Sequence, residues 1–241
     1  MRKLTVAVLV AGAAAIAGPS LAADLPYYPP IIEVPDVDYG YSGSFYLRGS
    51  AAWNMMWARE VNHPTAPVTN FGITDYGYGY SVGAGAGFET GTGLRVDATI
   101  DHIGNTGMTS NVVDPSGTLL NGDYNLGLRS TVVLANAYYD VRFGDGYSGG
   151  GGPVAYIGAG AGVAFNDAVV TDPIGREFRS NNSSLAAAGM VGLGYDFGQV
   201  VADVGYRALY INRIENTTAP MPFSINDNWV HEVRGTVRYR F

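Results

Sequence analysis

Hydrophobic and polar residues alternate one by one along most of the chain beyond residue 43. In the first such segment, Phe45, Leu47 and Trp53 share one parity, while Arg48 and Asn54 share the other. A period of two puts one set on each face of a β-strand, so each segment predicts a strand with an apolar face and a polar face. The pattern recurs in eight segments: 44–54, 77–88, 94–101, 129–141, 154–165, 184–197, 200–210 and 229–241.

The connections between these segments alternate in length. Longer ones are expected at 56–75, 104–123, 166–183 and 212–227, and shorter ones at 89–93, 142–152 and 198–199. Segments of this size suit tilted strands that cross a bilayer, and outer-membrane barrels have long external loops and short periplasmic turns. The predicted fold class is all-β: an eight-stranded antiparallel up-and-down transmembrane β-barrel with both ends on the periplasmic side.

Alternation by itself leaves open which face is outside, because a soluble lipocalin-type barrel would place the apolar face within. Here the apolar face carries small apolar residues flanked by aromatics, the other face carries opposed charges and glycines, and the chain ends on Phe241. Aromatic rings at both ends of an apolar band are typical of membrane interfaces. We therefore expect lipid outside and a closed wall, since lipid cannot satisfy free strand edges.

The first residues have the features of a secretory signal peptide. Arg2 and Lys3 precede an apolar run from Leu4 to Ala17, and small residues follow up to Ala22. The run is too short to span a bilayer as a helix. We predict a signal peptide at 1–22, a Pro/Tyr-rich periplasmic segment at 23–42 and the barrel at 43–241. No later run of 18 apolar residues occurs, which excludes an α-helical membrane protein.

Composition excludes several classes of function. Removal of Arg2 and Lys3 takes the formal charge from -7 to -9 and leaves no lysine, so nucleic acid is not an expected partner. Without cysteine there is no disulfide, thiolate metal site or cysteine nucleophile. The three histidines, His63, His102 and His231, have no metal-ligand spacing, and we expect neither a metal nor a cofactor. The oligomeric state stays open.

The polar faces gather charges of both signs that would meet inside the barrel. An eight-stranded barrel is just wide enough to be filled by side chains, so the simplest interpretation is a plug of ion pairs. A narrow pore is the alternative, because the glycines of the second, fifth and sixth segments would leave part of the lumen thin-walled. The predicted lumen network is Arg48, Arg95, Asp97, Asp101, Asp203, Arg207, Glu232, Arg234 and Arg238, with Asp140, Asp196 and Arg240 on the same faces.

Enzymatic activity is not expected. Asp101 and His102 form the one adjacent acid and base near the predicted outer end of a strand. Neighbouring residues of a strand face opposite sides, so this pair is a poor catalytic dyad.

Several short motifs resemble one family. They are "LANAYYDV" at 134–141, "AYIGAGAGVAF" at 155–165, "VGYR" at 204–207 and a terminal "VRYRF", after an Asp-Leu-Pro lead-in. Together they look like the small alphaproteobacterial outer-membrane barrels that are related to opacity proteins and often labelled porins. The terminal residues Val237, Tyr239 and Phe241 are similar to the signal recognised by the barrel assembly machinery.

The resemblance implies location in the cell outer membrane after export through the periplasm, in contact with lipopolysaccharide and phospholipid. The predicted function is a structural and surface role in the envelope, with a narrow porin-like channel as a further possibility. Because the broader family includes hemin-binding surface proteins, the alternative is ligand binding by surface loops, either hemin or host adhesion. His63, in the first external loop, is the only histidine placed to serve hemin.

Overall fold

The computed structural model describes residues 43–62, 70–117, 119–143, 151–216 and 223–241. The chain divides into two units, Met1–Asp38 and Tyr39–Phe241, and all described residues belong to the second. The predicted signal peptide, the Pro/Tyr-rich segment and His63 lie outside the described residues. They stay predictions.

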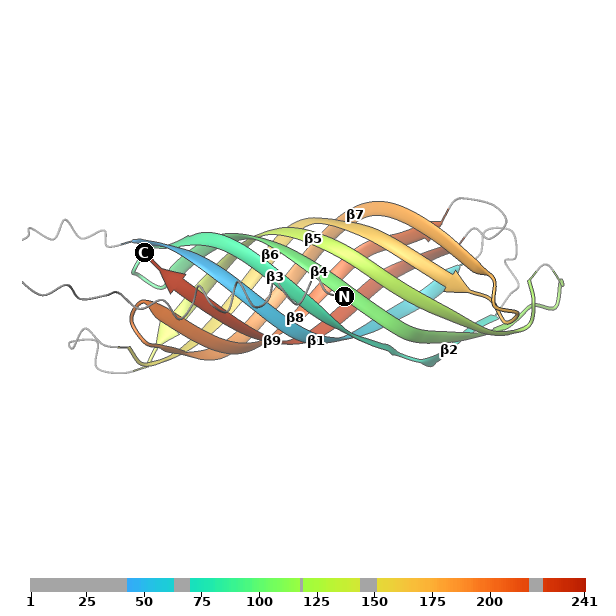
Figure 1. Cartoon of the computed structure of the whole chain (residues 1–241), viewed down its shortest axis with the longest axis horizontal. Coiled ribbons are helices and arrows are strands. Elements are labelled where there is room, and N and C mark those ends of the chain that lie inside the picture. The colour runs from blue at the N-terminus through green and yellow to red at the C-terminus, as the bar shows by residue number, and fades with distance from the viewer. Residues whose placement is uncertain (1–42, 63–69, 118, 144–150, 217–222) are drawn as a thin grey trace, which may run out of the picture. The chain divides into compact units, whose positions relative to one another are not determined.

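The described residues form one antiparallel sheet that closes into a ring (Figure 1). Neighbours around the ring follow the order β2-β4-β3-β1-β9-β8-β7-β6-β5, and β4 also pairs with β5. The strands are β1 (Ser44–Asn62), β2 (Asn70–Asp75), β3 (Gly77–Glu89), β4 (Leu94–Val113), β5 (Gly122–Arg142), β6 (Pro153–Thr171), β7 (Glu177–Asp196), β8 (Val200–Asn216) and β9 (Phe223–Arg240).

The short strand β2 was not predicted. It pairs with residues 109–113 of β4, whereas β3 pairs with residues 95–106 of the same strand. Both strands therefore occupy one position around the ring, interrupted at Tyr76, and the sheet has eight strand positions. The predicted eight-stranded antiparallel up-and-down barrel is confirmed.

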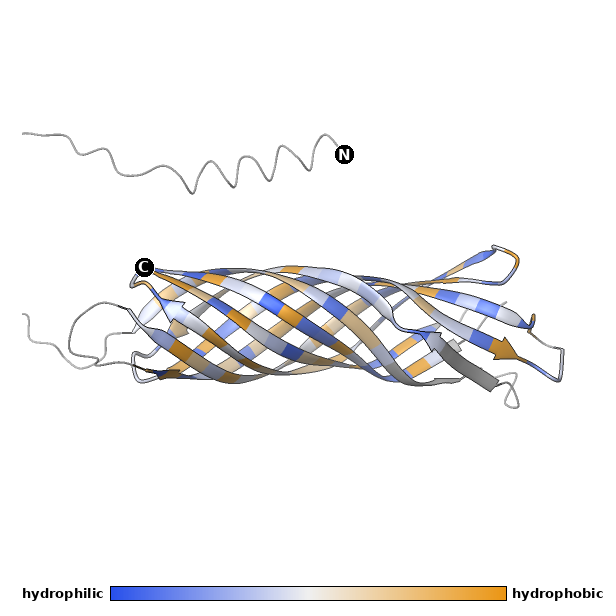
Figure 2. Cartoon of the chain, turned by 90° about the horizontal axis from the view of Figure 1, so that it is seen from below, coloured by the Kyte–Doolittle hydropathy of each residue, from blue (hydrophilic) through white to orange (hydrophobic). Residues whose placement is uncertain are grey.

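Hydrophobic and hydrophilic positions alternate along the strands (Figure 2), and the apolar side chains face outward, as predicted, in the part of the wall next to the short turns. Leu185 and Leu193 are each 69% exposed, and Phe45 is 68% exposed, while Arg95 on the inward face is only 2% exposed. This polarity is the reverse of a soluble barrel and suits a wall surrounded by hydrocarbon. The turns at 90–93 and 197–199 are short, so we assign their end of the barrel to the periplasm. No helix among the described residues is long and apolar enough to cross a membrane.

The predicted long loops are wrong for most of their length. Residues 104–113 continue β4, 166–171 continue β6, 177–183 belong to β7, and 212–216 continue β8. The outward-facing positions there carry polar residues, which is typical of loops, but the inward-facing positions carry apolar residues. These stretches are strands whose polar face has moved to the outside.

The polarity of the wall therefore inverts partway along the strands. On β4, outward Ile100 is followed by outward His102, while inward Asp101 is followed by inward Ile103. A β-bulge between Asn105 and Met108 then shifts the register, and Gly107 takes a φ of 95° there. Water outside the wall favours this arrangement, with polar residues outside and an apolar core within.

We call the inverted part of the interior the apolar layer. It fills the end of the barrel opposite the short turns with buried side chains from β4 to β9. Its main residues are Ile103, Met108, Val112, Leu126, Leu128, Val170, Leu209, Ile211, Ile214, Ile225 and Val230.

Inward glycines do not leave a thin wall, contrary to the pore hypothesis. Several of them lie against the ring of a tyrosine from a nearby strand, so the space beside the backbone is occupied by an aromatic side chain. Such pairs fill the lumen rather than open it. The pairs are Gly87 with Tyr46, Gly158 with Tyr138, and both Gly192 and Gly205 with Tyr156.

A valine at position 158 tests this packing. The added side chain would collide with the Tyr138 ring, so Gly158→Val should lower the free energy of unfolding by about 1–3 kcal/mol. Gly189→Val is the matched control, because an added Cβ at this outward position meets no atom within 4 Å. Urea unfolding in lipid vesicles, followed by tryptophan fluorescence, measures both. Equal stabilities would contradict the packing described here.

Candidate functional site

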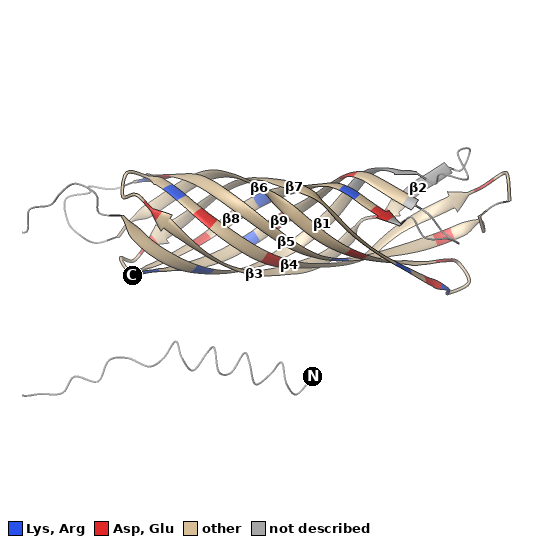
Figure 3. Ribbon diagram, turned by 90° about the horizontal axis from the view of Figure 1, so that it is seen from above, with Lys and Arg blue, Asp and Glu red and all other residues tan. Residues whose placement is uncertain are grey.

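The predicted lumen residues all lie buried inside the barrel, on the inward positions of β1, β4, β8 and β9. Figure 3 shows where positively and negatively charged residues fall along the strands. The alternation of each strand brings them there, because every second residue points to the axis. Asp140, Asp196 and Arg240 join them from β5, β7 and β9. The structure gathers most of these residues into three groups along the axis, while Arg240 and Asp196 pair separately at the periplasmic mouth.

The first group is a closed quartet next to the apolar layer. Arg207 contacts Asp101 at 2.7 Å and Glu232 at 2.5 Å, and Arg234 contacts the same two carboxylates at 2.7 and 3.0 Å. Ser81 donates a further hydrogen bond to Glu232 at 2.5 Å. Each arginine thus bridges both acids, and the quartet ties β4 to β8 and β9 across the lumen.

The second group surrounds Asp97. Arg48 Nη1 lies 2.9 Å from this carboxylate and donates another hydrogen bond to Tyr138 at 2.8 Å. Tyr46 and Asn136 also donate to Asp97, at 2.8 and 2.7 Å. Three donors from two strands, β1 and β5, leave Asp97 well satisfied within a buried environment.

The third group lies nearer the periplasmic end. Arg95 donates to Asp140 through two nitrogens, at 3.1 and 3.0 Å, and its guanidinium lies 3.8 Å from the centroid of the Tyr138 ring. Arg238 contacts Asp140 at 3.3 Å and Asp203 at 3.8 Å. Cation–π stacking and shared carboxylates hold these charges between layers of aromatic rings.

Arg240 closes the periplasmic mouth. It contacts Asp196 at 2.8 Å and also pairs with Glu89, and both acids are buried. The mouth is therefore crossed by ion pairs between β9, β7 and the end of β3.

The interior holds very little free space at the level of the charges. A cavity of about 10 Å³ lies among Arg48, Arg95, Tyr138 and neighbouring side chains, which is room for about one water molecule. Some buried arginine nitrogens there have no hydrogen-bond partner in the protein, among them Nε of Arg48 and Nη2 of Arg207. Such N–H groups are the natural partners of a trapped water.

Sequence reasoning missed the apolar layer, although its signal was present. Leu126 and Leu128 alternate with Asn125, Gly127 and Arg129 as regularly as the residues of the membrane segments do. In these stretches the apolar residues occupy the inward-facing positions instead of the outward-facing ones, so the stretches resemble loops in sequence. Any solute crossing the barrel would meet this apolar layer in series with the ion-paired groups.

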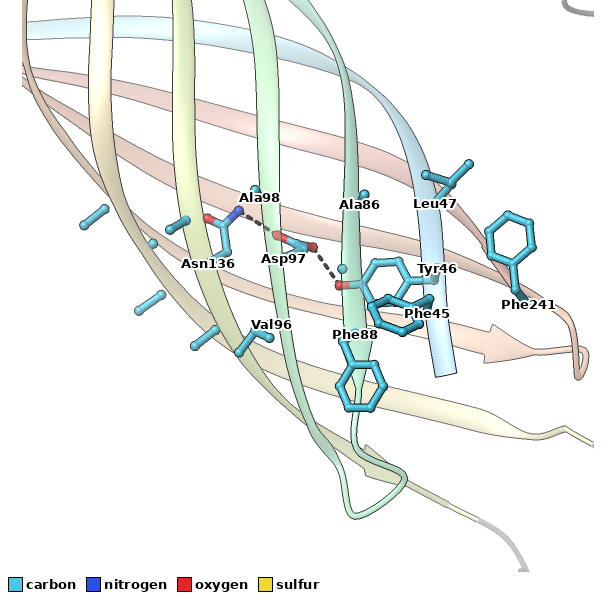
Figure 4. A pocket seen from close by; sticks show the side chains of 16 residues that line it. Phe45, Tyr46, Leu47, Ala86, Phe88, Val96, Asp97, Ala98, Asn136 and Phe241 are labelled. Atoms are coloured by element: carbon cyan, nitrogen blue, oxygen red, sulfur yellow. Dashed lines mark hydrogen bonds between the residues drawn. The ribbon is translucent and has the colours of Figure 1, made fainter. Parts of the chain in front are cut away.

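A shallow recess lies on the outer wall (Figure 4). Ala86, Ala98, Ala135 and Ala161 are directly paired across β3 to β6 and form its floor. Aromatic and branched side chains, such as Phe45, bound it. It belongs to the lipid-facing surface, not to the lumen.

Asp101 and His102 face opposite sides of the wall, as expected for strand neighbours. Asp101 is bound by the quartet arginines, whereas His102 is exposed and lies 3.4 Å from the Thr131 hydroxyl. No group of three or more His, Asp or Glu side chains among the described residues could hold a metal ion.

The last strand presents the predicted assembly residues to the outside. Val237, Tyr239 and Phe241 are 55%, 45% and 72% exposed, and the Phe241 amide donates to the Phe45 carbonyl at 3.0 Å. Recognition by the barrel assembly machinery stays a prediction.

Comparison with known proteins supports the fold. No protein-family model and no curated protein matches the sequence. Neisserial surface protein A is similar in structure, with 22% identity and a TM-score of 0.50 over 82% of this chain and 97% of that chain. OprG from Pseudomonas aeruginosa has 15% identity and a TM-score of 0.47 over 83% of this chain and 98% of that chain.

The likeness to Neisserial surface protein A reaches the barrel fold and no further, so the alphaproteobacterial family and its hemin-binding relatives stay predictions. The location follows from the wall itself. An apolar exterior, aromatic residues at both of its edges and a closed sheet are the features of an integral outer-membrane barrel in contact with membrane lipid.

Breaking the quartet tests its contribution to stability. Glu232→Ala leaves Arg207 and Arg234 short of a buried partner and should lower the free energy of unfolding by about 3–5 kcal/mol. Glu215→Ala is the control, because Glu215 pairs with Arg213 near the surface and such pairs contribute less than about 1 kcal/mol. Urea titration in vesicles measures both. Equal losses would show that the quartet is not a structural unit.

Proposed function

We propose that this protein is a closed, non-conducting outer-membrane barrel that strengthens the envelope and holds ordered hairpins above the membrane surface. The observation that carries the proposal is the two-part interior. Ion-paired groups fill the periplasmic half and the apolar layer fills the other half. Among the described residues, the charged groups are held in ion pairs, and the apolar layer offers aliphatic side chains where an ion would need polar groups to replace its hydration shell.

The apolar layer also stiffens the hairpins. Strands β4 and β5, and likewise β6 and β7, continue beyond the outward apolar band while packing Met108, Leu126 and Val170 against each other inside. Burial of these side chains stabilises the hairpins away from the bilayer by the ordinary hydrophobic effect. The hairpins therefore extend the barrel rather than form long loops.

Two hairpin tips are built alike, on Asp-Pro-x-Gly sequences starting at Asp114 and Asp172. The Asp172 carboxylate accepts hydrogen bonds from the amides of Ile174 and Arg176, at 3.1 and 2.7 Å. Although partial burial acts in the opposite sense, these bonds hold the pKa of Asp172 below its ordinary value. These hydrogen bonds to the ionised carboxylate are therefore retained above the ordinary carboxyl range and are lost as the pH falls through the lowered pKa of Asp172.

Binding by the surface hairpins is the second candidate function. Ile174 is 67% exposed at one tip and Leu120 is 42% exposed near the other. The tips adjoin, because a Cβ on Gly122 would lie 3.0 Å from Pro173. Two apolar side chains on adjoining tips favour contact with a partner surface. Hemin capture through His63 stays a prediction.

Single-channel recording in planar bilayers tests the closed barrel. The refolded protein should give no steady openings, because the apolar layer and the ion-paired groups block the lumen in series. Correct insertion is established by heat-modifiable gel mobility, and a wide general porin serves as the positive control. Steady openings that change when Arg48, Arg95 and Arg207 are replaced by alanine would establish the narrow channel instead.

A further inference from the structure

One arginine on the outside of the barrel, Arg129, has no partner among the residues that the structure describes. Arg129 on β5 is exposed and forms no hydrogen bond or ion pair with any described residue. The outward arginines of the surface hairpins differ, since Arg179 pairs with Glu177 and Arg213 pairs with Glu215. Arg129 therefore presents its full charge to whatever surrounds the wall.

The position of Arg129 is the edge of the apolar band. The outward residues of β5 run from Tyr139 through Ala135 and Val133 to Thr131, and then to Arg129. Val133 is 42% exposed and belongs to the band, whereas Thr131 begins the polar part of the wall. A cation at this level lies where lipid headgroups meet the wall.

Neighbouring strands place further polar groups beside it. Gly104 of β4 is the register partner of Arg129, and Tyr80 of β3 is the register partner of Gly104. A Cβ on Gly104 would lie 3.5 Å from the Tyr80 ring, so that ring leans over the glycine on the outer face. Because Gly104 has no side chain, it does not separate the Tyr80 ring from Arg129 on the outer face.

His102 and Thr131 complete the cluster. They are register partners one step nearer the apolar band, with the imidazole Nδ1 3.4 Å from the hydroxyl. A guanidinium, an imidazole and two hydroxyls are the groups that recognise phosphate. Asp167 of β6, the register partner of Arg129 on its other side, is exposed and forms no ion pair with it.

We propose that Arg129, with Tyr80, His102 and Thr131, binds the phosphate of an anionic glycolipid in the outer leaflet. The acyl chains of such a lipid would cover the apolar band below while its phosphate meets the cluster. The site would anchor the barrel at a fixed depth and angle. The proposal rests on the embedding of the wall in lipid and is independent of whether the lumen is closed.

Binding of purified bisphosphorylated lipid A to the full-length barrel in detergent micelles tests the site. Arg129→Gln should weaken binding about fivefold, which corresponds to the attraction of one arginine near a charged membrane surface. Arg213→Gln is the matched control and should bind as the wild type does, because Arg213 already has a carboxylate partner. Heat-modifiable mobility verifies that each variant is folded.

A second variant distinguishes a phosphate-binding site from a solvated pair of Arg129 and Asp167. Asp167→Asn removes a carboxylate that repels phosphate and should strengthen binding. Equal affinities for wild type and Arg129→Gln, equal losses in both arginine variants, or weaker binding by Asp167→Asn would overturn the proposal. So would undiminished binding of dephosphorylated lipid A. Full displacement of lipid A by millimolar inorganic phosphate would assign the cluster to free phosphate and reject the lipid.

Discussion

The structure depends on one constraint: the same wall must meet hydrocarbon along part of its length and water along the rest. Where the wall meets hydrocarbon, the outward-facing residues must be apolar, and polar residues can find hydrogen-bond or ion-pair partners only inside the barrel. In water, the energetically favoured arrangement is the reverse. Most strands meet both demands without an interruption, because the apolar residues move from outward-facing to inward-facing positions, as they do between Ile100 and Ile103 on β4.

This exchange of apolar and polar positions determines which residue types fill the interior. Where the exterior is apolar, the lumen receives arginines and carboxylates that would be very costly unless paired, and each of the three charged groups pairs them across several strands. Where the exterior is polar, the lumen receives leucine, isoleucine and methionine. Tyrosine rings over inward glycines fill what remains. The described interior of the barrel is thus occupied by ion pairs, aromatic rings and aliphatic side chains, which leaves its surface features as the parts available for function.

Much of this could be predicted from the sequence, because a period of two specifies both strand and face. The eight strand positions, the outward faces and the inward position of residues such as Arg207 and Glu232 all follow from parity. The partners did not follow, since pairing Asp101 with Arg207 requires the closure of β4 against strands far along the chain. The hairpin strands were predicted as loops because the polar residues at every second position were considered without the apolar residues between them.

The most direct test of the account is a cysteine scan along β5, which the cysteine-free chain permits. Single cysteines at outward positions 133 and 135 and at outward position 125 are treated with a water-soluble maleimide in lipid vesicles, with inward position 128 as the interior probe. The account predicts rapid labelling at 125 and protection at 133, 135 and 128. Labelling of 133 and 135 as fast as 125, or free labelling of 128, would contradict the inversion of polarity at the membrane surface.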